Sequence, residues 1–368
     1  MRIIISSLVI VFSLHSCKEI PITPLNITKS LTLIGEKQVT NNSFGYSITK
    51  DSLLIMIAYG DADEKFIHVY DTAFNFKFSV GDKGKLFSEF NMPQFFNTNF
   101  IDCHDSIIHM FDINLLQEKY FNLKKFIQNP QPEKEIKGRY LPTKLYFTDN
   151  LNILNDSTFV GKSIDMNYGS FFIYNSTSKE KKWIKFNHKF RYPDKKYEDQ
   201  SYLNSICVHP QKKKIIVAYR YFDLIQLYDD EGKLLQECCF SKIQKPLLST
   251  VASGMAPEAS FYNLSICGTN KYCYILRANK TGIQLQNQPQ KLSGQLIVMD
   301  WSGNIKNIYP CPELLYSICV DANDTYLFAT IDNYNDLEYS FIRNTNYKNN
   351  NNNYYITNNI KHNFHDKI

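Results

Sequence analysis

The sequence predicts an all-β protein, built as a six-bladed β-propeller of four-stranded antiparallel blades. Three observations indicate this fold class. A short apolar phrase recurs six times along the 368 residues. Between its copies, runs rich in Ile, Tyr and Phe alternate with corners of Asp, Asn, Ser or Gly, which is the pattern of strands and turns. No stretch of about 15 residues inside the repeats carries the sustained apolar stripe of a helix.

The recurring phrase sets the length of the repeat. It reads Ser-Ile-Cys in its last three copies, and its reference positions are Thr49, Cys103, Leu154, Cys207, Cys267 and Cys319. Successive reference positions are 54, 51, 53, 60 and 52 residues apart. A repeat of that length is typical of propeller blades. Such a scaffold indicates where a site would lie, but it does not specify the chemistry of that site.

Each repeat holds four expected strands. The phrase lies in the first strand, and a polar corner such as Asp51-Ser52 leads into an apolar second strand, here residues 53–58. A third and a fourth strand follow, joined by an Asp-x-x-Gly corner at 229–232 and again at 300–303. We expect Gly232 and Gly303 to adopt positive φ in these hairpins. Four strands in about 50 residues fit one blade.

The amino terminus predicts an envelope address. Arg2, an apolar core over residues 3–12 and the small residue Ser16 are typical of a secretory signal peptide, here residues 1–16. The run from Leu14 to Cys17 resembles the lipobox of bacterial lipoproteins, in which signal peptidase II cleaves before the cysteine and its thiol receives diacylglycerol. The resemblance implies lipidation of Cys17 and attachment to the membrane. Because Lys18 follows, it also implies an outer-membrane location. An ordinary secretory signal with an incidental cysteine is the alternative.

The rest of the chain divides into three parts. Residues 17–40 are expected to form a tether, stiffened by two prolines, and residues 41–345 the propeller. Residues 346–368 form an Asn-rich tail that we expect to be disordered. Within the tether, residues 30–34 alternate in polarity, so they could add an outer strand to the last blade and close the ring.

Two segments resemble the TolB-like six-bladed β-propeller lipoproteins of Bacteroidota. In residues 80–90, Glu89 and Phe90 match a loop of that family, while Leu86 and Phe87 stand where the family has Gly-Pro. Residues 295–329 resemble its closing blades. The resemblance covers about residues 30–345 and implies a propeller in the cell envelope. Since the family has no agreed activity, the resemblance carries over no catalytic residue.

Charge and cysteine content narrow the classes of partner and site. The formal net charge is +5, from 41 basic and 36 acidic residues, which does not suggest a nucleic-acid partner. The Lys clusters at 179–182, 195–196 and 212–214 are expected in solvated turns or loops.

Cysteines at equivalent blade positions lie too far apart for disulfides, so we expect them to be small buried residues. The adjacent Cys238 and Cys239 should point to opposite faces of one strand. The sequence leaves undecided whether Cys273 or Cys311 takes part in a disulfide. It contains no Cys or His spacing typical of a zinc site.

Several polar clusters were weighed as sites. The carboxylates Asp61, Asp63 and Glu64 indicate a solvated hairpin tip more than a calcium site, because no further spaced acidic ligands follow. A metal shared by Cys103, His104 and His109 is disfavoured, because the two histidines would face opposite sides of one strand. The single enzymatic hint is the placement of Asp102, Asn152 and Asn204 close to the repeated phrase. The Asp-Ser corners at Asp51, Asp105 and Asp156 also resemble an O-glycosylation pattern, although the repeat explains them equally well.

These observations predict a non-enzymatic envelope lipoprotein. We expect no catalytic residue, no metal and no cofactor, and a loop-rich face that binds a protein or a glycan. The insertion at about 241–260, with Met255 and Phe261, is one candidate for that face. The alternative is a propeller hydrolase or lyase with a metal-assisted site at the central channel. Three or more carboxylate or amide side chains that converge at one channel mouth would favour this enzyme.

Overall fold

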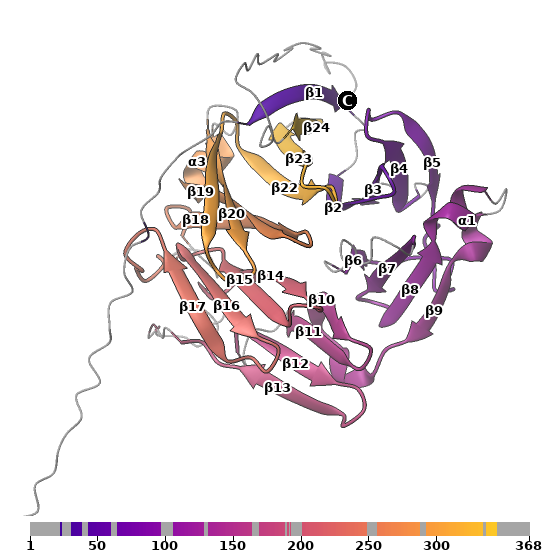
Figure 1. Cartoon of the computed structure of the whole chain (residues 1–368), viewed down its shortest axis with the longest axis horizontal. Helices are drawn as coiled ribbons and strands as arrows, with labels where there is room; N and C mark the ends of the chain where they lie inside the picture. Colours follow the sequence, from indigo (N-terminus) through magenta and orange to yellow (C-terminus); the bar gives the residue numbers. More distant parts are fainter. Residues whose placement is uncertain are drawn as a thin grey trace, which may run out of the picture.

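Four-stranded antiparallel sheets make up most of the computed structural model, which describes residues 23, 31–38, 43–59, 65–96, 106–128, 132–163, 169–187, 190, 192, 201–248, 256–287, 292–333 and 336–343. The sheets are arranged as a propeller around a common axis (Figure 1). The all-β fold class and the four-stranded blades are as the sequence predicts. The strands closest to the axis are those that begin each repeat.

Five of the sheets are each formed by four consecutive strands. The first sheet contains β2 (Ser43–Lys50), β3 (Leu53–Tyr59), β4 (Ile67–Asp71) and β5 (Phe76–Val80). The second contains β6 (Pro93–Phe95), β7 (Ile107–Asp112), β8 (Gln117–Asn122) and β9 (Lys137–Tyr140). The third contains β10 (Thr148–Asn155), β11 (Thr158–Ser163), β12 (Phe171–Asn175) and β13 (Glu180–Ile184). The fourth contains β14 (Asn204–His209), β15 (Lys214–Tyr219), β16 (Leu224–Asp229) and β17 (Leu234–Cys239). The fifth contains β18 (Ser260–Gly268), β19 (Tyr272–Thr281), β20 (Gly294–Asp300) and β21 (Ile305–Cys311).

The sixth sheet is formed by both ends of the described chain. It contains β22 (Leu315–Val320), β23 (Tyr326–Asn333), β24 (Asp336–Arg343) and β1 (Thr32–Gln38). The strand β1 pairs antiparallel with β24, from Thr32 opposite Arg343 to Gln38 opposite Glu338. It is therefore the outermost strand of this sheet (Figure 1), the place at which the sequence analysis puts a ring-closing strand.

Short helices occur in the connections. The helices α1 (Leu123–Gln128) and η1 (Pro132–Glu135) lie between β8 and β9, and η2 (Thr143–Leu145) leads into β10. The helix α3 (Gly282–Asn287) lies between β19 and β20. The sequence analysis did not anticipate these helices, because each is too short to carry a recognisable apolar stripe.

The Asp-x-x-Gly corners form as expected. Gly232 has φ 79° and Gly303 has φ 89°. At the first corner the carboxylate of Asp229 accepts hydrogen bonds from the backbone N–H of Glu231 (3.1 Å) and of Lys233 (2.8 Å). At the corner between β4 and β5, Phe74 adopts φ 59° in the place of the glycine, and its ring is buried. Burial of this ring offsets the strain that a non-glycine residue carries there.

Each pair of neighbouring sheets encloses one hydrophobic cluster. The cluster between the sixth and first sheets contains Leu54 and Met56 from one side and Cys319 and Phe328 from the other. The hydroxyl of Thr49 also donates a hydrogen bond to the carbonyl of Val320 across this interface (3.0 Å). The sheet that joins the two ends of the chain therefore packs on both of its neighbours.

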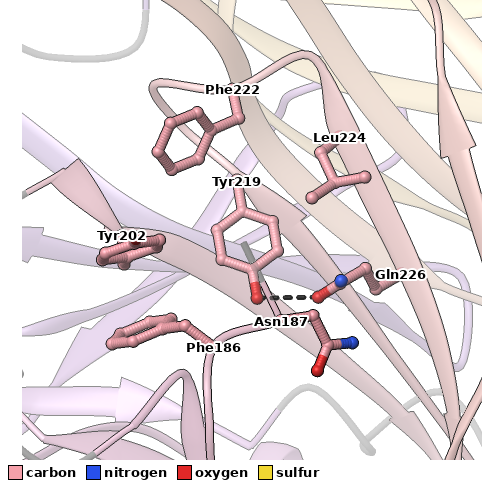
Figure 2. A pocket seen from close by; sticks show the side chains of 7 residues that line it. All are labelled: Phe186, Asn187, Tyr202, Tyr219, Phe222, Leu224 and Gln226. Atoms are coloured by element: carbon pink, nitrogen blue, oxygen red, sulfur yellow. Dashed lines mark hydrogen bonds between the residues drawn. The ribbon is translucent and has the colours of Figure 1, made fainter. Parts of the chain in front are cut away.

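A small recess remains between the third and fourth sheets (Figure 2). It is lined by Phe186, Asn187, Tyr202, Tyr219, Phe222, Leu224 and Gln226. The recess has room for about one water molecule, so it is not by itself a ligand pocket.

The loop that resembles a family motif has a structural role. Gly81 has φ 90°, and a Cβ atom at this residue would lie 2.7 Å from the buried ring of Phe90. The carboxylate of Glu89 accepts hydrogen bonds from the backbone N–H of Lys85 (2.7 Å) and of Leu86 (3.0 Å). Gly81, Glu89 and Phe90 therefore fix the crossing from the first sheet to the second.

Candidate functional site

The candidate site lies where the inner strands begin. In the antiparallel sheets, the start of each inner strand lies beside the end of the second strand, as Asp149 of β10 lies opposite Lys162 of β11. Polar side chains gather there on the second and third sheets. We call this group, together with the adjoining Phe147, the mouth; its polar members are Gln94, Asp149, Asn150, Asn152 and Lys162.

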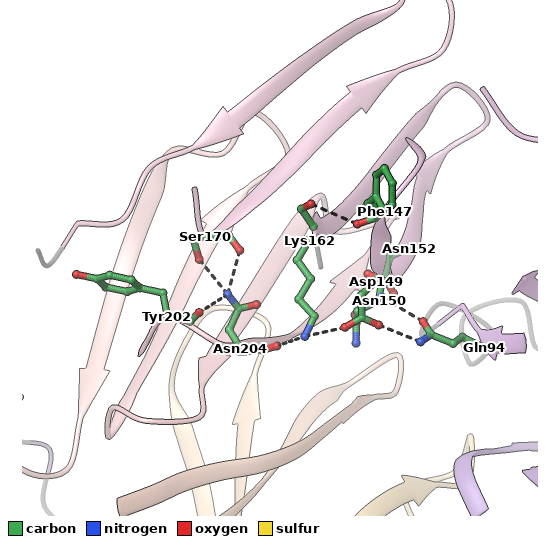
Figure 3. A network of polar contacts seen from close by, with 10 residues as sticks. Gln94, Phe147, Asp149, Asn150, Asn152, Lys162, Ser170, Tyr202 and Asn204 are labelled. Carbon is green, nitrogen blue, oxygen red and sulfur yellow. Dashed lines mark hydrogen bonds and ion pairs between the residues drawn. The ribbon is translucent and has the colours of Figure 1, made fainter. Parts of the chain in front are cut away.

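Hydrogen bonds connect the mouth across two sheets (Figure 3). The amide of Gln94 donates to one carboxylate oxygen of Asp149 (2.9 Å), and its carbonyl accepts from the backbone N–H of Asn150 (3.1 Å). The ammonium of Lys162 lies 3.1 Å from the other oxygen of Asp149 and donates to the carbonyl of Asn204 (2.6 Å). Three sheets are thus tied together around one carboxylate.

The charge of Asp149 is stabilised by this arrangement. Burial alone would raise the pKa of the carboxyl, but the Lys162 ammonium and the Gln94 amide together hold the pKa below its usual value. The side chains of Lys162 and Asp149 are 11% and 28% exposed, so solvent reaches the carboxylate from one side. Asp149 is therefore an anion at neutral pH that can still accept hydrogen bonds from outside.

Phe147 is the most unusual residue of the mouth. It precedes β10, its side chain is 70% exposed, and its φ is 57°. An aromatic residue in the left-handed region is strained, and an exposed ring gains little from burial to offset this. Its neighbour Tyr146 is also exposed, with the two ring centroids 6.3 Å apart, and Asn150 has φ 53°. The segment 146–150 thus presents strained backbone and two exposed rings at the entry to β10.

Asn204 and Asn263 tie neighbouring sheets together. The amide of Asn204, at the start of β14, donates to the carbonyls of Ser170 (2.9 Å) and Tyr202 (3.1 Å). The amide of Asn263, in β18, donates to the carbonyl of Tyr219 in the fourth sheet (2.8 Å). Each thus holds the loop between the second and third strands of the preceding sheet, at Ser170 or at Tyr219.

The side-chain oxygens of these residues are available as acceptors. Within the described residues, the buried Oδ1 atoms of Asn204 and Asn263 and the Oγ1 atom of Thr148 have no hydrogen-bond partner. Such buried acceptors are rare unless water or a ligand pairs with them.

A buried ion pair and a hydroxyl network connect the fourth sheet to its two neighbours. Both guanidinium nitrogens Nε and Nη2 of Arg277 donate to the carboxylate of Asp223 (2.7 and 2.6 Å), and the side chains are 5% and 1% exposed. Nη1 donates to Gln295 (2.6 Å). In the recess of Figure 2, the hydroxyl of Tyr219 donates to Gln226 (2.7 Å) and lies 2.7 Å from the hydroxyl of Ser170. Burial raises the pKa of Tyr219 well above its usual value, so this hydroxyl stays neutral.

The candidate residues that the sequence indicated lie in different parts of the molecule. Asn204 is the first residue of the inner strand β14 and ties two sheets, whereas Asn152 lies in the middle of β10 and donates to Asn150. His109 lies 3.2 Å from the carboxylate of Glu118. Phe261 packs on Tyr221, with ring centroids 5.0 Å apart. Other candidates lie outside the described residues, namely Cys17, Asp61, Asp63, Glu64, Asp102, Cys103, His104, Asp105 and Met255.

Of the six residues of the mouth, only Asn152 was indicated from the sequence, whereas Gln94, Phe147, Asp149, Asn150 and Lys162 were missed. A signal for Lys162 was present, because this lysine lies one residue before the end of the otherwise uncharged, buried strand β11. Nothing local marks Phe147, because its strain depends on the path of the chain from η2 into β10.

Within the part of the chain that the structure describes, no group of three or more His, Cys, Asp or Glu side chains could hold a metal ion. The seven described cysteines, Cys273 and Cys311 among them, are free thiols. No helix among the described residues is long and apolar enough to cross a membrane.

Comparison with known proteins identifies the fold and no more. No family model and no curated protein matches the chain. A solved structure of a DUF4221 family member from Bacteroides vulgatus is 11% identical, covering 87% of this chain and 97% of its own, with a TM-score of 0.48. A protein of Bacteroides fragilis that is described as exported is 13% identical, covering 85% of this chain and 94% of its own, with a TM-score of 0.50. At these identities the likeness is one of fold alone.

Proposed function

We propose that the protein is a non-catalytic binding scaffold of the bacterial cell envelope, which takes a protein or glycan partner at the mouth. The observation that carries this proposal is Phe147, an exposed ring in a strained conformation, two residues before the ionised Asp149 in the chain. Strained residues persist where the surrounding structure holds them, and they cluster at functional sites. An aromatic face beside hydrogen-bonding groups suits a sugar ring or an apolar side chain of a partner.

The proposal includes the architecture and the address. We take the composite sheet of β1 and β22–β24 as the sixth blade of a closed six-bladed, TolB-like ring. We also propose that residues 1–16 direct export and that Cys17 carries the lipid, which attaches the protein to the outer membrane. The exported protein of Bacteroides fragilis with a similar fold is compatible with this address. Replacing Cys17 by Ser should abolish incorporation of radiolabelled palmitate and release the protein from the membrane fraction.

Three forms of the full chain test the binding function. The original protein, Phe147→Ala and Leu235→Ala would each be immobilised, then exposed to a detergent-solubilised envelope extract and to a glycan array. Leu235 is a matched control, because it is 44% exposed and lies on β17 of the fourth sheet. We expect the original protein and Leu235→Ala to retain the same partner, and Phe147→Ala to lose it. Equal retention by all three forms, or retention by none, would contradict the proposal.

A metal-assisted hydrolase or lyase is the second candidate. One observation favours it, since the oxygen-bearing side chains of Gln94, Asp149, Asn150 and Asn152 converge at the mouth. The ammonium of Lys162 already supplies a positive charge to the single carboxylate among them, which favours the binding scaffold. Metal analysis of the purified protein, with and without Asp149→Asn, separates the two. A stoichiometric metal that this substitution removes would support the enzyme.

A further inference from the structure

Two thiols meet at the interface between the fourth and fifth sheets. Cys207 lies on β14 and Cys273 on β19, and both side chains are fully buried in the same hydrophobic cluster. Two residues after Cys207, the ring of His209 lies 3.2 Å from the backbone carbonyl of Asn270 in the turn before β19, so the ends of the two strands that carry these thiols meet. They are not at equivalent blade positions, because Cys207 is on an inner strand and Cys273 on the second strand of the next sheet. The distance argument against pairing equivalent cysteines therefore does not apply to them.

The shape of the propeller allows this approach. Face-to-face sheets usually pack about 10 Å apart, which is too far for a disulfide. Propeller sheets converge toward the axis, and Cα atoms of β14 lie within 8 Å of Cα atoms of β18, the neighbour of β19. An inner-strand residue can therefore approach the next sheet much more closely than an outer-strand residue can.

The other thiols of the region are worse partners. Cys238 belongs to the same cluster but lies on β17, three strands away from β14, which corresponds to about 14 Å at the usual strand spacing. Cys267 packs against the cluster between the fifth and sixth sheets, on the opposite face of its sheet. The pairing of Cys207 with Cys273 is thus the one that the topology favours.

We propose that Cys207 and Cys273 become joined by a disulfide that links the fourth and fifth blades when the chain folds in an oxidising compartment. The two thiols lose two protons and two electrons, and the sulfur atoms form one S–S bond. The electrons reduce an external disulfide, either a small molecule or a thiol–disulfide oxidoreductase, to two thiols. The inference rests on the export part of the proposed function for its compartment, but the chemistry requires only an oxidant during folding.

Burial sets the time at which the bond can form. Burial, together with the contact to Cys207, raises the pKa of the Cys273 thiol well above its usual value. Thiolate is the reactive form, so the reduced pair is almost inert once the protein is folded. The bond should therefore form before the fourth and fifth sheets close over it. Once formed, it should resist reducing agents until the protein unfolds.

The test uses the denatured and reduced protein, refolded in a buffer of oxidised and reduced glutathione. After refolding, free thiols are alkylated in denaturant and the peptides are mapped by mass spectrometry without reduction. We expect a peptide pair that links Cys207 to Cys273, and no such pair in protein refolded under full reduction. Cys273→Ala should leave Cys207 free for alkylation, whereas the control Cys311→Ala, a buried thiol in another cluster, should keep the link.

A second measurement covers the case in which the alanine variants fold poorly. The oxidised original protein should unfold at a higher denaturant concentration than the reduced one, because the bond closes a loop of about 65 residues in the unfolded chain. Full alkylation of both cysteines in correctly refolded protein, or a link from Cys207 to Cys238 or Cys267, overturns the proposal. Cell fractionation tests export separately, so a cytoplasmic protein that forms the link in the glutathione buffer contradicts only the proposed location.

Discussion

At the residue scale, polar side chains at the starts of the inner strands connect neighbouring sheets. The sequence indicated Asn152 and Asn204 as an enzymatic hint, and the structure places both near the mouth. Asn204 has a connecting role there, and Asn263 shares it. Sequence reasoning could find the recurring asparagines because the repeat aligns them. It could not find the partners of Asp149, since Gln94 and Lys162 reach it from residues 55 and 13 positions away.

The ion pair of Asp149 and Lys162 gives a prediction with a pH signature. Lys162→Met removes the cation, so the protein must hold a largely buried carboxylate without its partner. We expect the free energy of unfolding at pH 7 to fall by an amount near the lower end of ~3–5 kcal/mol, because Asp149 is not fully buried. Chemical denaturation of the two proteins measures this difference. The exposed pair of Lys65 and Asp82 is the control, and Lys65→Met should change stability by less than about 1 kcal/mol.

The pH dependence follows from the lowered pKa of Asp149 in the folded protein. A carboxyl with a lowered folded pKa stabilises the fold above its unfolded pKa, near 4, and loses this contribution as the pH falls through the folded pKa. In Lys162→Met the carboxyl can take up a proton instead. The stability difference between the two proteins should therefore shrink on going from pH 7 to pH 3. A difference that stays constant over this range would show that the ion pair is not its cause.

At the element scale, the turns account for most of what the sequence predicted correctly. The Asp-x-x-Gly corners indicated hairpins, and Gly232 and Gly303 adopt the expected positive φ. The corner at Asp71 was harder to read, because Phe74 takes the glycine position and uses core packing to hold it. The short helices were missed for a related reason. Six residues of α1 cover one local cluster around Phe126, and so few residues show no period.

Gly232→Ala tests the strength of this turn requirement. A Cβ atom there would lie 2.2 Å from Cδ1 of Ile184 in the preceding sheet, and alanine at φ 79° is strained as well. The left-handed conformation alone costs about 1–2 kcal/mol, so we expect a loss of at least that size in the free energy of unfolding. Glu231→Ala is the neighbouring control, because this exposed side chain makes no comparable contact. Equal effects of the two substitutions on the denaturation midpoint would refute the requirement for glycine.

At the scale of the whole molecule, the repeat predicted the architecture because every blade must present the same pattern of buried positions to its two neighbours. Each pair of neighbouring sheets encloses its own hydrophobic cluster. Each period of 50 to 60 residues in the sequence therefore corresponds to one sheet of the fold. The site does not repeat. Its main residues, Phe147, Asp149 and Lys162, occur in one sheet and its entry loop. As a set they have no counterpart in the other copies of the repeat, so a comparison of the repeats does not reveal them.

Ring closure gives the last prediction. The composite sheet depends on β1, which pairs with β24 and leaves the other edge of β24 bonded to β23. Removing residues 18–40 while keeping Cys17 exposes β24 as an edge and leaves its backbone groups without their partners from β1. We expect the melting temperature to fall by several degrees, since 1 kcal/mol corresponds to about 2 °C in a large domain. Removing residues 346–368 is the control and should leave the melting temperature unchanged. If the two truncations melt at the same temperature as the full chain, β1 does not close the ring, and the propeller is held by the clusters between its sheets alone.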